Sequence, residues 1–207
     1  MDIIGIIAGV WVITGILLIG IIAGILPSLA GCLLRWKECL NLENSMKLSH
    51  DRNIFAIYMT VPFCLAISCY RLYDPEFLSH VQGLAYTGCI FGVFAGYLMA
   101  RTVPYILVRK PKGGEKTFKF ARRVSWSYFC IMAAAVLATA GICSFSKVSM
   151  ETSRTVLYYV ILSLYLLSVF RKFQIFNNSC SFLTSFLYLC ALEILPAGIL
   201  VLPAVFL

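Results

Sequence analysis

Six apolar runs, each near the length that an α-helix needs to cross a bilayer, divide this chain. Short segments that carry most of the charged residues separate them. Of the 207 residues, 61% are apolar and only 13% are charged, and this composition excludes an ordinary soluble domain. The pattern predicts an all-α integral membrane protein: one polytopic domain, residues 1–207, built as a bundle of about six transmembrane helices.

The predicted spans differ in length and in the residues that interrupt them. They cover residues 3–26, 54–70, 81–108, 124–145, 155–170 and 182–207. Pro27 provides a natural end for the first span, because proline removes a backbone donor and breaks a helix. The second span is short and contains Pro62. The third contains Arg101 and Pro104, so we expect its last part to be kinked or to leave the hydrocarbon.

Residues 28–48 change character after the first span. Leu29, Leu33, Trp36 and Leu40 recur at helical spacing, with charged residues elsewhere around the helix. This pattern predicts a short amphipathic helix on the membrane surface, and Ser28 is a suitable N-cap for it.

Lysine and arginine are distributed unevenly between the connecting segments. Thirteen lie in the first, third and fifth connections, three lie in the second and fourth, and Arg101 lies within a span. Basic residues near span ends resist translocation and stay cytoplasmic. We therefore expect the first, third and fifth connections on the cytoplasmic side and both termini outside.

The third connection, residues 109–123, is the most basic segment of the chain. Its positive residues are Arg109, Lys110, Lys112, Lys116, Lys119, Arg122 and Arg123. Such a segment beside a span attracts anionic lipid headgroups by about 1 kcal/mol per charge, so we expect a cytoplasmic loop that contacts anionic lipids. It is not a phosphate-binding loop, because Glu115 stands where that motif needs glycine before the lysine. Phe118 and Phe120 could anchor the loop in the membrane, and nucleic acid is not an expected partner.

Small residues recur at every fourth position in the third and fourth spans. The rows are Gly88, Gly92, Gly96 and Ala100 in the third, and Cys130, Ala134 and Ala138 in the fourth. Rows of this kind let two helices approach closely. We expect these two spans to pack tightly through them.

The cysteines and histidines form no recognisable site. The nine cysteines include no Cys-x-x-Cys pair, so neither a zinc nor an iron–sulfur site is expected. His50 and His80 are predicted on opposite sides of the membrane and therefore cannot share a metal. We expect no metal and no cofactor. The standard hydrolytic motifs are missing, which leaves an enzyme unsupported but not excluded.

Glu193 is the strongest functional pointer in the sequence, because the last apolar run contains no basic residue to neutralise it. A carboxylate at the centre of a bilayer costs roughly 2.5–3.5 kcal/mol on insertion scales, so it usually faces a protein interior or a wet cavity. One alternative pairs Glu193 with Arg101, directly or through water. The other keeps it neutral through desolvation and hydrogen-bonded to a neighbouring helix. Pro196, three residues later, could open the local backbone.

Around Glu193 the chain resembles a known family. The stretch Leu187–Pro196 (LYLCALEILP), preceded by a tyrosine-rich span that ends Phe170-Arg171-Lys172, is similar to the membrane family called domain of unknown function 4271. The resemblance covers most of the chain and is weak over the N-terminal third. It implies a bacterial inner-membrane protein of the Bacteroidota, but it implies no activity.

These features favour a non-enzymatic subunit or scaffold of a cell-envelope assembly in the inner membrane, with another membrane protein or a second copy as its partner. One alternative is a small transporter or proton-coupled channel component that uses Glu193. Another is a lipid-modifying enzyme whose basic loop holds headgroup phosphates.

Overall fold

The computed structural model describes residues 13–16, 18–34, 39, 45–78, 80–81, 83–107, 115–178 and 180–206, and most of them are helical. In chain order the elements are α2 (Ile19–Leu34), α4 (Met46–Cys69), the 3₁₀ turn η1 (Glu76–Leu78), α5 (Leu84–Leu107), α6 (Glu115–Phe145), α7 (Met150–Asn177), α8 (Phe182–Leu189), the π-helical turn η2 (Cys190–Ile194) and α9 (Leu195–Phe206). No β-strand occurs in these ranges, and the predicted all-α class is confirmed.

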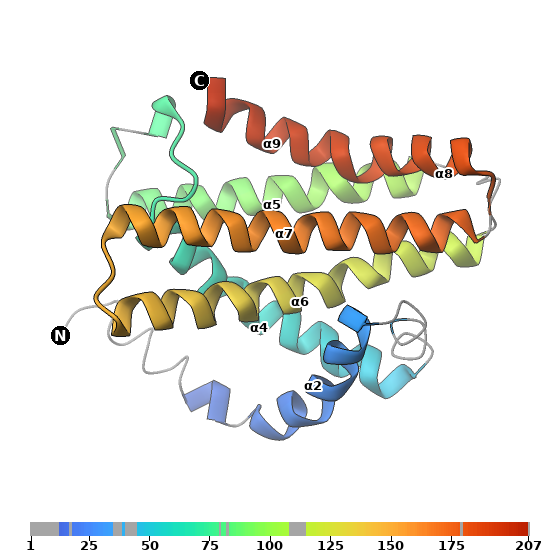
Figure 1. Ribbon diagram of the computed structural model, residues 1–207, viewed down its shortest axis with the longest axis horizontal. Helices are drawn as coiled ribbons and strands as arrows, with labels where there is room; N and C mark the ends of the chain where they lie inside the picture. Colours follow the sequence, from blue (N-terminus) through green and yellow to red (C-terminus); the bar gives the residue numbers. More distant parts are fainter. Residues whose placement is uncertain are drawn as a thin grey trace.

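Five helical stretches are long and apolar enough to cross a membrane. They are Met46–Cys69, Leu84–Tyr105, Thr117–Phe145, Met150–Asn177 and Phe182–Leu202. Successive stretches run in opposite directions along the bundle (Figure 1). Ile19–Leu33 is apolar but shorter. The chain is therefore a polytopic membrane protein.

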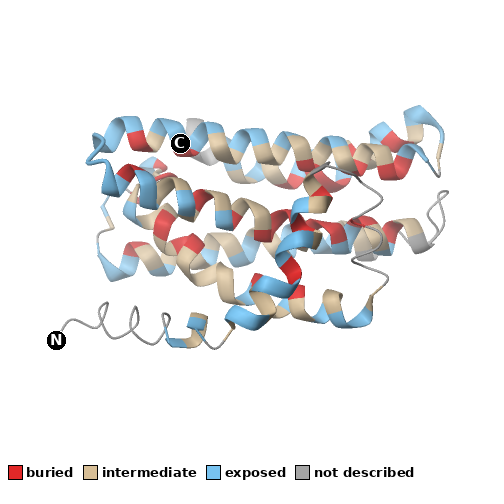
Figure 2. Cartoon of the chain, turned by 60° about the horizontal axis from the view of Figure 1, so that its bottom comes forward, coloured by how far each residue is buried: buried red, intermediate tan, exposed pale blue. Residues whose placement is uncertain are grey.

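Helix α6 lies between α4 and α7 (Figure 1). Helix α5 packs on α4, α8 packs on α7, and η2 and α9 lie against α5. In α5 only 11% of the apolar stretch is buried, against 33% in α4 and in α6. Burial is accordingly densest along the inner pair α4 and α6, whereas few residues of α5 are buried; Figure 2 colours the chain by burial.

Three helices extend past the apolar runs that predict them. Helix α4 begins at Met46 rather than at residue 54, α6 begins at Glu115 rather than at residue 124, and α7 continues to Asn177 rather than ending at Phe170. Each extension contains basic residues, and the apolar run that predicts the helix stops before them. Lysine and arginine are nevertheless good helix formers, and their long stems can lie along apolar surface. The predicted basic loop is thus helical from residue 115 onward.

Pro27 does not end the first helix, because α2 passes through it and continues to Leu34. Ile25, Leu29 and Cys32 are buried along one side of α2, so packing against the bundle holds the helix beyond the proline. Ser28 therefore lies inside a helix and is not an N-cap. Of the predicted interfacial helix 28–48, residues 28–34 belong to α2 and 46–48 open α4. The stretches 35–38 and 40–44, like residues 3–12 of the first span, lie outside the described residues.

The prediction that the third and fourth spans pack through small residues is wrong. Most members of the two rows lie on exposed faces: Gly88, Gly92, Gly96, Ala100, Ala134 and Ala138. A Cβ added to any of these glycines would meet no atom within 4 Å. Helix α5 packs mainly on α4 and touches α6 little, while α6 turns Cys130 and Ala133 inward. A four-residue period identifies a face of a helix but not the neighbour that this face meets.

Aromatic side chains hold the inner helices together. The rings of Phe63, Phe94 and Phe129 lie with their centroids 5.4–5.9 Å apart and join α4, α5 and α6. At the end of α4, the hydroxyl of Tyr70 donates a hydrogen bond to the carbonyl of Ala140 in α6 at 3.1 Å. Lipid tails are as apolar as these side chains, so close packing and interhelical hydrogen bonds stabilise the bundle rather than the hydrophobic effect.

Candidate functional site

Glu193 lies in η2, where the last span widens for one turn. The N–H of Leu195 donates to the carbonyl of Cys190, five residues earlier, which is the π-helical pattern. Pro196 follows directly. Proline has no N–H and its ring crowds the carbonyl four residues before it, so it disfavours a regular α-helical turn at this point. In the widened turn Leu192 and Glu193 are both buried, with relative exposures of 1% and 2%.

Helix α5 supplies two partners of the Glu193 carboxylate. Arg101 Nη2 lies 2.9 Å from Oε2 and donates to Oε1 at 3.2 Å. The hydroxyl of Tyr105 donates to Oε1 at 2.8 Å. Residues four apart lie on one face of a helix, so the same side of α5 presents both groups. Arg101 also donates to the hydroxyl of Ser125 in α6, and this hydroxyl donates to the carbonyl of Ala121.

Helix α7 supplies a second cation, Lys172. Its Nζ lies 2.8 Å from Glu193 Oε1, and its side chain is completely buried. At this distance the two groups form a buried ion pair. Two turns earlier on α7, the hydroxyl of Tyr165 donates to the backbone carbonyl of Glu193 at 3.1 Å. Glu193 is therefore held by its side chain and by its backbone.

We refer to Arg101, Tyr105, Lys172 and Glu193 as the charge cluster. Two cations within 3 Å compensate the cost of burying one carboxylate, and their attraction is stronger in a low-dielectric interior than in water. With all three groups ionised, the cluster carries one excess positive charge. It can tie α5, α7 and the last span together, and it favours an anion over a cation in its surroundings.

An aromatic layer lies beside the charge cluster, towards the start of α6 and the end of α7. Phe118, Phe176 and Tyr188 pack with ring centroids 4.8–6.1 Å apart, and Tyr105 also contacts Phe118. Phe118 is only 6% exposed. The idea that Phe118 anchors the basic segment in the membrane is therefore wrong, because this ring faces the interior of the bundle.

A cavity of about 90 Å³ borders the charge cluster. Arg101, Ser125 and Glu193 form its polar wall, and aromatic residues such as Tyr97 and Phe129 form much of the remainder. Each molecule of liquid water occupies about 30 Å³, so the cavity has room for a few small polar molecules at most.

Of the three intramembrane positions that the sequence singles out, the structure brings Arg101 and Glu193 into contact, and Pro196 follows the π-helical turn that carries Glu193. The direct pairing of Arg101 with Glu193 is one of the two alternatives considered above. The basic residues Lys119, Arg122 and Arg123 are exposed on the first turns of α6. Arg109, Lys110 and Lys112 lie outside the described residues, as does the side chain of Lys116.

The sequence pattern does not reveal Lys172, Tyr105 or Tyr165 as site residues. It places Lys172 in a connecting loop, because the apolar run ends at Phe170. A signal was nevertheless present in polar residues at helical spacing. Tyr97, Arg101 and Tyr105 recur every four residues on α5, and Tyr165, Ser168 and Lys172 follow three- and four-residue steps on α7. These two polar stripes meet at Glu193.

Metal ligands are not gathered within the part of the chain that the structure describes. No three His, Cys, Asp or Glu side chains there are placed to hold a metal ion. All nine cysteines are free. The charge cluster would repel a divalent cation, because its two positive groups outnumber the single carboxylate.

The charge cluster lies within the part of the chain that matches a known protein family. A family model described as Domain of unknown function (DUF4271) matches residues 35–202. No curated protein and no solved structure matches the chain. The matched region begins after α2 and includes all four residues of the charge cluster.

Proposed function

Since the chain belongs to the family described as Domain of unknown function (DUF4271), we propose that it is a non-enzymatic subunit or scaffold of a cell-envelope assembly. In this proposal it resides in the bacterial inner membrane, with the basic ends of α4, α6 and α7 facing the cytoplasm. Both termini then face outward. Basic residues at these helix ends favour that orientation, because they resist translocation.

The observation that carries this proposal is that the groups of the charge cluster are paired with one another. Both oxygens of Glu193 are engaged by Arg101, Tyr105 and Lys172, all from the same chain. A general base or a carrier carboxylate needs an oxygen that is free to meet its substrate, whereas both oxygens of Glu193 are already engaged where the side chain borders the small cavity. The arrangement supports a role in fixing helix positions, which is what a subunit needs in order to present a constant lateral surface.

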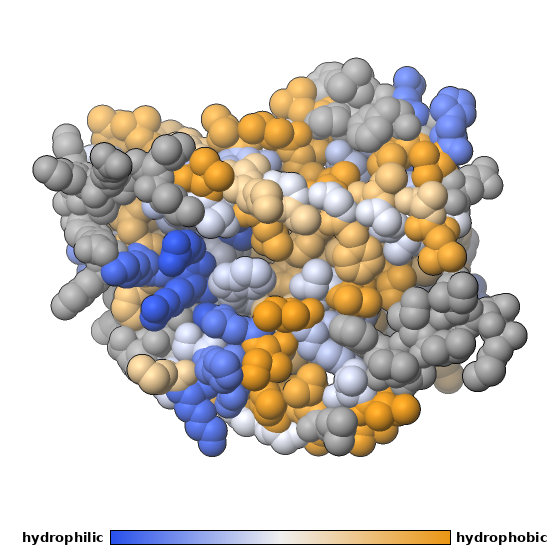
Figure 3. Space-filling view, turned by 180° about the vertical axis from the view of Figure 1, so that it is seen from behind, coloured by the Kyte–Doolittle hydropathy of each residue, from blue (hydrophilic) through white to orange (hydrophobic). Residues whose placement is uncertain are grey.

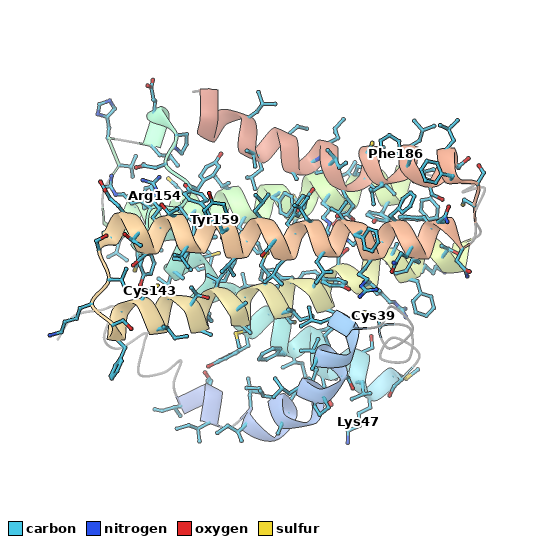
Figure 4. The ribbon with its side chains drawn as sticks, in the orientation of Figure 1. Cys39, Lys47, Cys143, Arg154, Tyr159 and Phe186 are labelled. Carbon is cyan, nitrogen blue, oxygen red and sulfur yellow. The ribbon has the colours of Figure 1, made fainter. Side chains whose placement is uncertain are left out.

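In-membrane photocrosslinking tests this proposal. A photoreactive residue would replace one exposed residue on each of three helices: Gly92 on α5, Tyr159 on α7 and Phe186 on α8. Tyr159 and Phe186 are labelled in Figure 4. A subunit should yield one defined protein adduct from one or two of these positions, and the same partner should copurify in fixed stoichiometry from mild detergent. The absence of protein adducts from all three positions would contradict the proposal.

A second candidate, a transporter or proton-coupled channel component, is favoured by the cavity beside Arg101, Ser125 and Glu193. Proton flux into reconstituted vesicles, followed with a pH-sensitive dye under an imposed membrane potential, separates the two candidates. A subunit should give the same flux as empty vesicles. Flux that disappears in Lys172→Met, while the protein still inserts and folds, would establish the second candidate instead.

A further inference from the structure

The cavity of about 90 Å³ beside the charge cluster lies between α5, α6 and α7. Arg101 and Glu193 form part of its wall, whereas Lys172 is completely buried and does not line it. Two exposed residues, Thr102 and Arg122, also line the cavity, so it is open to the surface of the bundle. A small solute can therefore meet the charge cluster here.

The charge cluster has one positive charge more than it has negative charge when Arg101, Lys172 and Glu193 are all ionised. In the described part of the chain, no second carboxylate forms an ion pair with either cation. A charge that is buried away from water is costly unless an opposite charge compensates it. The excess charge therefore favours an anion close to Arg101 or Lys172, and the cavity borders Arg101.

The wall of the cavity offers hydrogen-bond donors. Arg101 directs Nη2 at Ser125 and Glu193, and its guanidinium has more N–H donors than these partners accept. The hydroxyl of Tyr97 lies beside Arg101 and keeps its own proton for another acceptor, because an arginine can only donate. Ser168 of α7 also lines the cavity, and its hydroxyl makes no hydrogen bond with another described residue.

Free acceptors are scarce in the same wall. Glu193 is the one carboxylate among the described lining residues, and both of its oxygens are already engaged. The hydroxyls of Tyr105 and Tyr165 donate to Glu193, and that of Ser125 donates to a backbone carbonyl. The cavity thus suits a ligand that accepts hydrogen bonds and carries negative charge.

Volume and wall chemistry narrow the class of this ligand. The cavity equals the volume of about three molecules of liquid water, which excludes a nucleotide or a lipid headgroup. Phe94, Trp126 and Phe129 form much of the remaining wall and supply no charge. A divalent anion would lose far more hydration energy beside them than a monovalent one. One negative charge also matches the excess of the cluster.

We propose that this cavity binds one small monovalent anion of the size of chloride, held by Arg101, Tyr97 and Ser168 and attracted by the excess charge of the charge cluster. With the anion bound, two positive and two negative charges balance. The site needs no free oxygen on Glu193. It therefore goes beyond the subunit role proposed above, and it does not depend on that role.

Equilibrium dialysis of the purified full chain against radioactive chloride measures this site. The experiment is done in detergent at constant ionic strength, with sodium gluconate replacing sodium chloride. We expect saturation at a single chloride per chain. Nitrate and bromide should compete with chloride, whereas gluconate should not, because it is too large for the cavity.

Two variants separate the charge from the donors. Lys172→Met removes the excess charge and leaves every residue of the cavity wall in place. We expect it to weaken chloride binding about tenfold or more. Ser168→Ala removes one donor without changing the charge, and it should weaken binding about threefold.

The control must remove a positive charge that attracts anions only diffusely. Seen from behind, hydrophilic residues gather towards the end of the molecule where α4 and α6 begin, beside a mainly apolar surface (Figure 3). Lys47 is exposed, does not line the cavity and points away from the bundle (Figure 4). Because salt screens exposed charges, Lys47→Gln should change the affinity for chloride less than about twofold.

Three results would overturn the proposal. Wild-type chain that binds no chloride in a saturable manner would mean that the cavity holds only water and that Lys172 has given up its proton. Equal losses in Lys172→Met and Lys47→Gln would mean diffuse attraction, and competition by gluconate as strong as that by nitrate would place the anion outside the cavity. Circular dichroism checks that the variants fold. If Lys172→Met does not fold, unchanged affinity in Ser168→Ala contradicts the site on its own.

Discussion

Glu193 balances two cations, so replacing each charged residue of the cluster should have unequal effects on stability. Glu193→Leu leaves Arg101 and Lys172 buried without a counter-charge. We expect the free energy of unfolding to fall by about 3–5 kcal/mol, as when one partner of a buried pair is removed. Lys172→Met removes the excess charge and keeps the Arg101–Glu193 pair, so its cost should stay below about 1.5 kcal/mol. Equilibrium unfolding in mixed micelles measures both.

The reverse order of these two variants would show that Lys172, and not Arg101, is the main counter-charge of Glu193. Exchange of Arg101 and Glu193 is a poor test of the same pairing. Glu193→Arg would place a guanidinium beside the buried ammonium of Lys172, which lies 2.8 Å from the carboxylate. The exchange would therefore fail even though the pair is present.

Two tyrosines allow hydrogen bonds to charged and neutral acceptors to be compared. Tyr105→Phe removes a bond to the ionised carboxylate of Glu193, and we expect it to lower the free energy of unfolding by about 1.5–3 kcal/mol. Tyr165→Phe removes a bond to the backbone carbonyl of Glu193 and should cost about 0.5–1.5 kcal/mol. The same unfolding experiment applies. Equal losses would argue against an ionised carboxylate.

At the scale of residues, the sequence reveals a charge inside an apolar run more readily than it reveals where a helix ends. Glu193 and Arg101 are visible because each interrupts an apolar run. Lys172 is hidden because it follows the end of a run, where a buried lysine and a loop lysine have the same sequence context. Only the spacing from Tyr165 marks its inward face, and that spacing becomes informative when the helix is known to continue to Asn177.

Among the elements, η2 gives the last span one residue more than a regular α-helix would use in that turn. Deleting exposed Ala191 should let the turn close as α-helix without rotating α8 relative to α9, because the π-helical turn accommodates one extra residue. Ser185 and Leu189 should then stay buried. Deleting exposed Leu187, within the regular turns of α8, should instead rotate the residues before it by about 100° and turn Ser185 away from the bundle. We expect a lower thermal midpoint for the second deletion than for the first, measured by circular dichroism in detergent.

The matched control for this deletion is Ala191→Leu, which keeps the length of the turn at an exposed position. It should leave the thermal midpoint nearly unchanged. If the deletions of Ala191 and of Leu187 lowered the thermal midpoint equally, the π-helical turn would not be accommodating an extra residue.

The positions of the described spans follow from apolar length, but their ends and neighbours do not. Hydropathy ends a span at the first charge, whereas α4 contains Arg52 and α6 begins within the basic segment. Pro27 likewise shows that a local breaker can be outweighed by packing, since Ile25 and Cys32 on either side of it are buried. Which helices become neighbours depends on how well the surfaces of helices far apart in the sequence fit together. The apolar pattern of a single run holds no information on this fit.

For the whole molecule, the family match begins at residue 35, but the folded unit includes α2. The carbonyl of Cys32 accepts from Tyr128 OH at 3.1 Å, and that of Leu33 accepts from Arg171 Nη2 at 3.0 Å. A chain that begins at residue 35 loses both acceptors. We expect its thermal midpoint to fall by about 4–8 °C, from about 1 kcal/mol per bond.

Coexpression of residues 1–34 as a separate segment is the control for that truncation, and it should restore much of the loss. A truncated chain with an unchanged thermal midpoint would show that α2 is an accessory to the bundle. The class of the molecule could thus be predicted from composition. The integration of α2 into the core could not, because it depends on contacts with α4 and α6.

Helix α4 packs more extensively on α6 than on its successor α5, and this also sets an order in time. Arg52 donates to Arg123 and Ser127, which follow it by 71 and 75 residues. At about 5–20 residues per second, a ribosome completes these partners about 4–15 s after Arg52 itself. During that interval water or lipid headgroups take the place of these two acceptors. We therefore expect α4 to reach its final position in the membrane only after α6 has been synthesised.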